Sequence, residues 1–332
     1  MQAWINKNRH IARLIGIMLF VFVVMSALNP TVFLSAANFQ SMALQTPELG
    51  FLSIAAALVL ISGGIDLSVT GTATLSGIAA ALTMRSFSAA GEAPLWTVLL
   101  ACAAALVTGC VCGALNAVLV ARVSIPPMLV TLGTMNLFTG VGIVLTKGSA
   151  ISKFPFSFLQ IGNGLLFGVP VPFLLFLGAI GVLAFFLNKT KLGFKLYVYG
   201  TNPVTSFYSA INNTKVVFTT YLISGFVSSV AGLIMVSRVN TAKADFGASY
   251  GLQALLVAVL GGINPSGGHG KALGILSAIV TLQFLSSGFN LLHVSSFLKD
   301  LTWGALLVFI MVLNTLEPRK KHKSQNASKA KE

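Results

Sequence analysis

The sequence predicts an all-α polytopic membrane protein with about ten transmembrane helices. Of its 332 residues, 55% are hydrophobic and 8% are charged, and the mean hydropathy is +0.89. Soluble domains carry about 25% charged residues, so a soluble fold is excluded. Apolar runs of roughly the 20 residues that cross a bilayer recur along the chain. They cover residues 12–29, 48–62, 66–84, 94–121, 126–146, 165–187, 215–237, 251–262, 271–290 and 299–315.

The first run, 12–29, follows basic residues and imitates a secretory signal peptide. It is long for such a segment, and its removal would leave an odd number of spans with a basic C-terminus inside. We therefore expect an uncleaved first helix.

Two runs, 48–62 and 251–262, are short, and both end at a pair of glycines, Gly63-Gly64 and Gly261-Gly262. Short apolar runs beside a glycine break are typical of discontinuous helices in transporters. The stretches around the two pairs, VLISGGIDLS and AVLGGINPS, also resemble each other. The echo is compatible with an internal repeat and equally with a local coincidence.

The run 94–121 carries small residues at every fourth position, among them Gly109 and Gly113. Helices in lipid associate by close backbone approach over such residues, so this stripe is predicted to pack. Ser224, Ser228 and Gly232 repeat the pattern in the run 215–237 and are expected to serve packing alone.

The net charge of +14 is distributed unevenly. Fifteen of the 21 basic residues fall on one side of a ten-span arrangement: Lys7, Arg9, Arg13, Arg122, Lys189, Lys191, Lys195, Lys215, Lys271 and six in the tail from Arg319 to Lys331. By the positive-inside rule, both termini are predicted to be cytoplasmic, and a nucleic-acid partner is not expected. Residues 1–316 are predicted to form one transmembrane domain, and residues 317–332 a basic, disordered, lipid-facing tail.

No enzyme site is predicted. The segment GGINPSGGHGKA at 261–272 imitates a phosphate-binding loop, but Pro265 replaces its first glycine and Ala272 its magnesium-binding hydroxyl. Histidines are scattered, and Cys110 and Cys112 point to different faces of one helix, so no metal or other cofactor is expected. ATP hydrolysis would require a separate subunit.

Asp66 is expected to be the one acidic residue clearly within an apolar run. An intramembrane carboxylate is a functional candidate by default. It could instead cap the helix that begins after the Gly63-Gly64 break, where the helix dipole favours negative charge. The residues favour the cap and leave direct solute contact open.

The longest polar interruption, about 188–215, is predicted to be a cytoplasmic loop. Asn202 followed by Pro203 is a typical helix start, so we expect a short helix over about 203–211. It would expose Phe207 and Tyr208 as aromatic anchors for a partner. An ordinary connection between spans is the alternative.

Several stretches together resemble the inner-membrane permeases of ribose-type ATP-binding-cassette sugar importers. They are GGIDLSVTG, NAVLVARVSIPPMLVTLGTM, SGFVSSVAG, LQALLVAVLGGINPSGGHGKALG and SGFNLLHVSSFLKDLTWGALLV. The resemblance covers nearly the whole chain in the right order. It implies import of a simple sugar across a bacterial cytoplasmic membrane, with a binding protein outside, a separate ATPase and a second permease subunit.

The same resemblance implies that the helix after Gly200 contacts the ATPase. The residues assigned to it are Gly200, Asn202, Pro203, Thr205, Ser206, Phe207, Tyr208, Ser209 and Ala210. Thr205 and Ser206 replace the usual alanines and Ala210 the usual glycine. Gly251 and Gln253 stand where the family usually has acidic residues, which alters either the substrate or the contact with the binding protein.

A neutral sugar needs uncharged donors and acceptors along its pathway. The candidates are Asp66, Ser68, Asn116, Thr131, Thr134 and Gln253, although helix-backbone bonding or packing would account for most of them. The same architecture would suit a nucleoside, a signalling furanone or an amino acid. An ion-coupled secondary transporter is a further alternative, but it usually needs more intramembrane charges.

Overall fold

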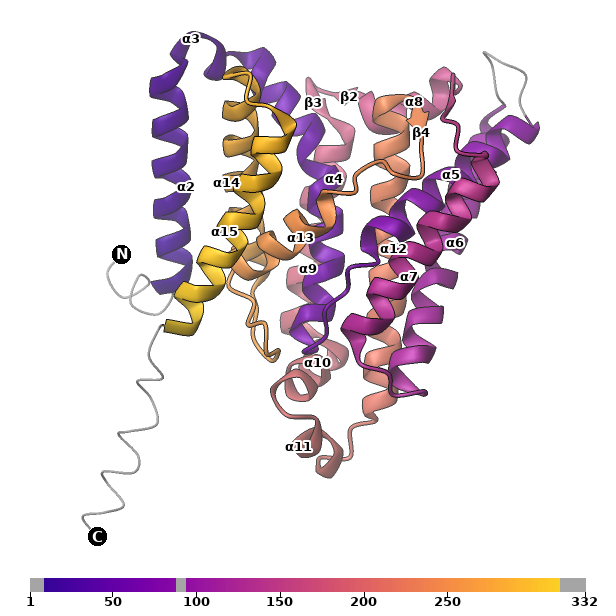
Figure 1. The fold of residues 1–332 in the computed structure, drawn as a ribbon, viewed down its shortest axis with the longest axis vertical. Coiled ribbons are helices and arrows are strands. Elements are labelled where there is room, and N and C mark those ends of the chain that lie inside the picture. Colours follow the sequence, from indigo (N-terminus) through magenta and orange to yellow (C-terminus); the bar gives the residue numbers. More distant parts are fainter. Residues whose placement is uncertain (1–8, 88–93, 317–332) are drawn as a thin grey trace.

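The computed structural model describes residues 9–87 and 94–316 (Figure 1). Within these ranges each predicted apolar run overlaps a helix. The helices are α2 (Arg9–Leu28), α4 (Ala36–Ile61), α5 (Val69–Phe87), α6 (Leu95–Ala121), α7 (Pro127–Thr146), α9 (Val171–Lys189), α12 (Asn213–Val239), α13 (Tyr250–Leu260), α14 (Ala272–Leu291) and α15 (Ser296–Leu316). The predicted disordered tail, 317–332, lies outside the described residues.

The all-α, polytopic class is confirmed. In the described part of the chain, seven helices are long and apolar enough to cross a membrane: α2, α4, α6, α7, α9, α12 and α14. Helices α5, α13 and α15 are not in this set, and α13 has only 11 residues. The predicted count of ten crossings is therefore not confirmed.

The shorter elements distinguish the two ends of the molecule. They are α3 (Pro30–Phe33), β1 (Ile151–Ser152), α8 (Phe156–Asn163), β2 (Leu165–Leu166), β3 (Val169–Pro170), α10 (Lys191–Thr201), α11 (Pro203–Tyr208) and β4 (Thr241–Ala242). Strand β1 pairs antiparallel with β4, and β2 with β3. The strands and α8 lie at the upper end in Figure 1, whereas α10 and α11 project from the lower end, where α2 begins and α15 ends.

Helix α4 is the centre of the fold. In its most apolar stretch 89% of the residues are buried, against 17% in α2, so α4 is enclosed by protein and α2 lies at the periphery. One apolar core joins Leu52 of α4 to Phe176 of α9, Ile234 of α12, Leu256 of α13 and Ile275 of α14. A helix that is apolar on all sides is stable either in lipid or inside a protein core, and the burial of α4 places it in the core.

The prediction that 48–62 is a short span was wrong. Helix α4 has 26 residues, begins after Ser35, whose side chain accepts a hydrogen bond from the Asn38 amide (3.2 Å), and continues through Pro47. Polar residues and Pro47 in its first half made the apolar run seem to begin at Glu48. The second short run is a short helix, α13.

Helices α6 and α12 are in backbone contact at Gly109 and Gly113. A Cβ atom at Gly109 would lie 2.4 Å from the Cβ of Ser229, and one at Gly113 would lie 2.5 Å from the Tyr221 carbonyl oxygen. No larger residue fits there without moving a helix. The small-residue stripe therefore faces α12.

Candidate functional site

Helices α4 and α13 end in the same way. Gly63 (φ 81°) and Gly262 (φ 84°) adopt the left-handed conformation that glycine tolerates best. Each helix is then closed by the pair of backbone hydrogen bonds of a Schellman motif. The donor–acceptor pairs are Gly63–Leu60 (2.9 Å), Gly64–Val59 (3.1 Å), Gly262–Val259 (3.0 Å) and Ile263–Ala258 (3.1 Å).

An Asx turn follows each helix end. Asp66 Oδ1 accepts from the Ser68 amide, and Asn264 Oδ1 from the Ser266 amide, both at 3.0 Å. The left-handed glycine is the first of its pair after α4 but the second after α13. The two turns therefore make the same kind of hydrogen bond. The turn after α4 has one more residue between the left-handed glycine and the Asx residue than the turn after α13.

Asp66 is buried, and its segment is hydrogen-bonded to three helices. Its Oδ1 also accepts from the Ser68 hydroxyl (2.6 Å), and its Oδ2 accepts from the Ser224 hydroxyl on α12 (2.8 Å). Asn116 on α6 donates to the Ser68 hydroxyl (2.7 Å). Thr131 on α7 donates to the Ile65 carbonyl (2.9 Å). Segment 62–68 is thus tied to α6, α7 and α12.

The structure changes the reading of several predicted pathway residues. Because α5 begins only at Val69, Asp66 lies before the N-cap position and holds an Asx turn, so the expected capping role was wrong in this respect. Thr134 bonds the Val130 carbonyl of its own helix (3.0 Å). Gln253 lies on α13, which is not among the helices that the Asp66 bonds join. Ser224 was expected to serve packing alone, and no spacing signal pointed to its bond with Asp66.

Helix α11 begins as expected. The Asn202 side chain accepts from the amides of Val204 (2.9 Å) and Thr205 (3.2 Å), and Pro203 follows at the first helical position. The helix ends at Tyr208, earlier than the predicted residue 211, and the chain turns left-handed at Ala210 (φ 58°). Phe207 and Tyr208 are 70% and 84% exposed.

The α10–α11 segment is attached to the rest of the fold on two sides. Ser206 donates to the Asn213 side chain of α12 (2.7 Å), which donates in turn to the Pro203 carbonyl (2.8 Å). At Gly200 of α10, a Cβ atom would collide with the Ile61 carbonyl oxygen and lie 2.6 Å from the Gly268 amide. That amide donates to the same Ile61 carbonyl (2.8 Å). Gly200 therefore sits where the chain leaving α4 meets the chain leaving α13.

A cavity of about 310 Å³ lies beside this junction. Its volume is at the lower limit for small-molecule sites, which span roughly 300–1,000 Å³. It is lined by Ser62, Gly63, Gly64, Val120, Pro127, Tyr199, Gly200, Thr201, Pro203, Val217, Tyr221 and Ser266. None of these residues carries a charge, and the buried Tyr221 hydroxyl has no partner among the described residues.

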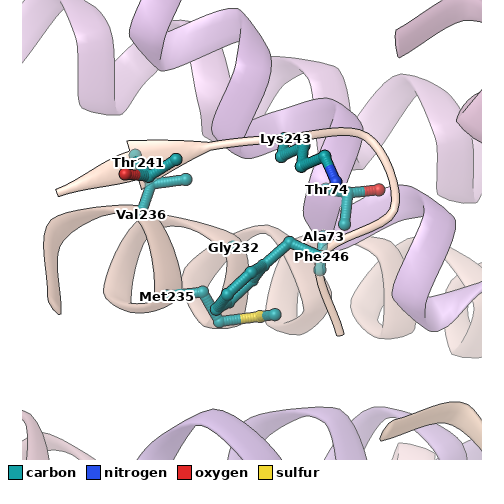
Figure 2. A pocket seen from close by; sticks show the side chains of 8 residues that line it. All are labelled: Ala73, Thr74, Gly232, Met235, Val236, Thr241, Lys243 and Phe246. Carbon is teal, nitrogen blue, oxygen red and sulfur yellow. The ribbon is translucent and has the colours of Figure 1, made fainter. Parts of the chain in front are cut away.

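A second cavity, at the upper end, is too small for a solute. Figure 2 shows Lys243 and Phe246 of the loop after β4 over Ala73 and Thr74 of α5 and over Gly232 of α12. Its volume of about 10 Å³ is close to that of one water molecule. In the described part of the chain, no group of three or more His, Cys, Asp or Glu side chains is placed to hold a metal ion.

Sequence reasoning missed a buried ion pair. Glu48 of α4 is fully buried and bonded to Arg238, which lies in the last turn of α12 and not in a loop. The acidic residue inside an apolar helix is therefore Glu48, whereas Asp66, which the sequence suggested, lies in the turn between α4 and α5. The error has the same origin as the misplaced start of α4, because the predicted run begins at Glu48 and puts this residue at its edge, whereas α4 extends twelve residues further toward the N-terminus.

Residues 38–311 match the family model described as "Branched-chain amino acid transport system / permease component". The autoinducer 2 import system permease protein LsrD of Escherichia coli K12 is 32% identical over 270 residues, 80% of this chain and 79% of the relative. Proteins of the same name from Shigella flexneri and Escherichia coli O157:H7 match equally well. No solved structure matches significantly. These matches cover most of the chain, which therefore belongs to the sugar and branched-chain amino acid permease family of ATP-binding-cassette importers.

Proposed function

We propose that this permease carries a small, neutral, hydroxyl-rich solute, with a simple sugar as the first candidate, and that α11 is the helix through which the ATPase drives transport. The observation that carries the proposal is the position of Gly200. It lies in contact with the end of α4 and with the chain that follows α13, shortly before the helix that exposes Phe207 and Tyr208.

The contacts form a continuous path from α11 to the interior. Helix α11 is bonded to α12 through Asn213, and Gly200 leaves no space between α10 and Ile61. Beyond Ile61 the chain leads to Asp66, which accepts a hydrogen bond from Ser224 of α12, and to Ser68, which accepts one from Asn116 of α6. Closely packed interiors transmit a displacement because they cannot compress. A push on α11 would therefore move both turns.

The lining of the larger cavity supports a neutral solute. Tyr199 and Tyr221 supply aromatic rings, and Ser62, Thr201 and Ser266 supply hydroxyl groups, with no charge nearby in the lining. Sites with apolar surfaces and a few polar groups suit a small ligand that must be oriented. A zwitterionic amino acid would find no partner for its charges there.

A signalling furanone is the second candidate. The relatives named above are autoinducer 2 import permeases. A furanone derived from a sugar shares the sugar's size, neutrality and hydroxyl groups, so the same lining would accept it.

We further propose the orientation and assembly. The lower end in Figure 1 carries α10, α11, the start of α2 and the end of α15, and it would face the cytoplasm of a bacterial cell. Lys189, Lys191, Lys195 and Lys215 lie at this end, which agrees with the positive-inside rule. The complex would contain two permease subunits, ATPase subunits below and a binding protein above.

Uptake by reconstituted vesicles tests the proposal. The permease would be reconstituted with its ATPase and binding protein, and uptake of labelled ribose and labelled autoinducer 2 measured with each competing against the other. We expect accumulation only with ATP and with the ATPase present. Accumulation driven by a proton or sodium gradient in vesicles lacking the ATPase would contradict the mechanism, and uptake of neither solute would contradict the proposed substrate class.

A further inference from the structure

Three helices converge on the carboxylate of Glu48. Arg238, at the end of α12, donates through Nε and also through Nη2 (3.0 Å). The hydroxyl of Tyr250, the first residue of α13, donates to Glu48 Oε2 (3.2 Å). Glu48 is fully buried, and the Arg238 side chain is 24% exposed. We call these three residues the outer cluster.

The outer cluster lies at the upper end of the short helix α13. Helix α13 has 11 residues, about 16 Å at 1.5 Å per residue, roughly half of a bilayer core. Its lower end leads through Gly262 to Gly268, which contacts α10 beside Gly200. Its upper end follows the loop 243–249 and is bonded to Glu48 through Tyr250. Motion that enters α13 from α10 therefore strains the bond between Tyr250 and Glu48.

A buried charge pair resists gradual displacement. Both side chains have lost most of their water, so moving them apart would leave buried polar groups without a partner. The Tyr250 bond differs from the ion pair, because its loss leaves Glu48 and Arg238 still paired. The hydrogen bond from Tyr250 is thus the contact in the cluster that breaks at the lowest cost in free energy.

We propose that the outer cluster is a latch: Tyr250 bonded to Glu48 holds the upper end of α13 closed, and its release accompanies the opening of the solute pathway toward the binding protein. The inference rests on the proposed function, in which the upper end is extracytoplasmic and α11 receives the ATPase. Glu48 and Arg238 are positioning residues that act through Tyr250.

The test compares Tyr250→Phe with the wild type in the complete complex of permease and ATPase in lipid nanodiscs. The variant keeps the ring and the ion pair and removes one hydrogen bond to a charged group, a loss that favours the open state by roughly tenfold. We expect ATP hydrolysis without binding protein to rise severalfold, so that the stimulation by binding protein falls. The melting midpoint should remain near that of the wild type.

Two further variants sharpen the result. Asp245→Asn breaks the exposed pair between Lys243 and Asp245 (2.9 Å) in the adjoining loop and should leave the stimulation unchanged. Glu48→Gln, which leaves Arg238 without its charge partner, should lower the yield as well as the stimulation. An active complex in which Tyr250→Phe keeps the wild-type stimulation would overturn the latch, whatever its melting midpoint. A wild-type complex with no ATP-dependent uptake would overturn the proposed function, and the latch with it.

Discussion

Asp66 shows how hydrogen bonds can satisfy a carboxyl group inside the protein. Both carboxylate oxygens accept hydrogen bonds, from Ser68 and from Ser224, and Asn116 extends the group to α6. Buried polar groups are tolerated when their partners are in place. Together with the Thr131 bond to the Ile65 carbonyl, the group ties segment 62–68 to α6, α7 and α12. We propose that the role of Asp66 in transport is to hold this turn in shape.

We predict that Asp66→Asn retains most membrane abundance and uptake, whereas Asp66→Leu loses abundance. The asparagine oxygen can still accept from Ser68, and the Ser224 hydroxyl can turn to accept from the new amide. Leucine would leave buried donors unpaired at roughly 1–3 kcal/mol each. Immunoblots of membranes and uptake by the same cells measure both quantities. An asparagine variant that is abundant but inactive would show that the charge itself is needed.

The Ser224→Ala substitution provides the matched control. It removes only the bond to Asp66 Oδ2 and leaves that oxygen unpaired. Its effect on stability should be smaller in the Asp66→Asn background than in the wild type, because the two side chains interact directly. Additive effects would mean that the Ser224 bond to the aspartate is no stronger than its bond to the asparagine.

At the scale of elements, α11 combines a fixed buried side with an exposed one. Ser206 is buried and bonded to Asn213, while Phe207 and Tyr208 point away from the fold and pack edge to face at 5.9 Å. Exposed aromatic pairs on a rigid helix are typical of binding anchors. The small size of Ser206 is required by its contact with α12.

We predict that the double substitution Phe207→Ala and Tyr208→Ala prevents copurification with the ATPase. Anchors of this kind contribute about 2 kcal/mol or more each, so affinity should fall well beyond tenfold. The control is Phe156→Ala with Phe167→Ala, two exposed aromatics (71% and 98%) at the opposite end. Yield of the ATPase equal to that of the control would place the contact elsewhere.

We predict that Gly200→Ala uncouples ATP hydrolysis from uptake. The added methyl group collides with backbone atoms of both turns, and overpacking of this kind costs about 1–3 kcal/mol. Gly181→Ala in α9 is the matched control, because nothing lies within 4 Å of its Cβ position. The ratio of solute transported to ATP hydrolysed is the measurement. An unchanged ratio would remove Gly200 from the proposed path.

At the scale of the whole molecule, the basic residues are concentrated at one end of the fold. The element ends that carry most of the basic residues lie at the α10–α11 end, and the short strands lie at the other (Figure 1). During membrane insertion, the end that is richer in Lys and Arg stays on the cytoplasmic side. The proposed orientation follows from it.

We predict that cysteines at Lys195 and Ser152 label from opposite sides of the membrane. Both positions are exposed, and they lie on α10 and β1. The background would carry alanine at Cys102, Cys110 and Cys112. An impermeant thiol reagent added to intact spheroplasts should reach Ser152→Cys alone, and Lys195→Cys should react only after lysis. Labelling of both in intact spheroplasts would contradict the proposed topology.

Much of the fold was predictable because lipid imposes strong local rules. Long apolar runs must become helices, so each run was found, and glycine pairs marked the ends of α4 and α13. The start of α11 followed from Asn202 and Pro203 for equally local reasons. The start of α4 was missed because its first half is polar, and two of these residues, Asn38 and Glu48, have partners distant in the sequence, Ser287 and Arg238.

The sequence by itself determined the membrane class, the helix breaks and the family, since each depends on neighbouring residues or on motifs read in order. The tertiary structure alone decided which polar groups meet: Asp66 with Ser224, 158 residues apart, and Glu48 with Arg238, 190 apart. It also placed Gly200 between two turns that lie in different halves of the chain. Pairing of this kind depends on how the helices pack. Packing brings together residues that are far apart in the sequence, so no local sequence pattern predicts it.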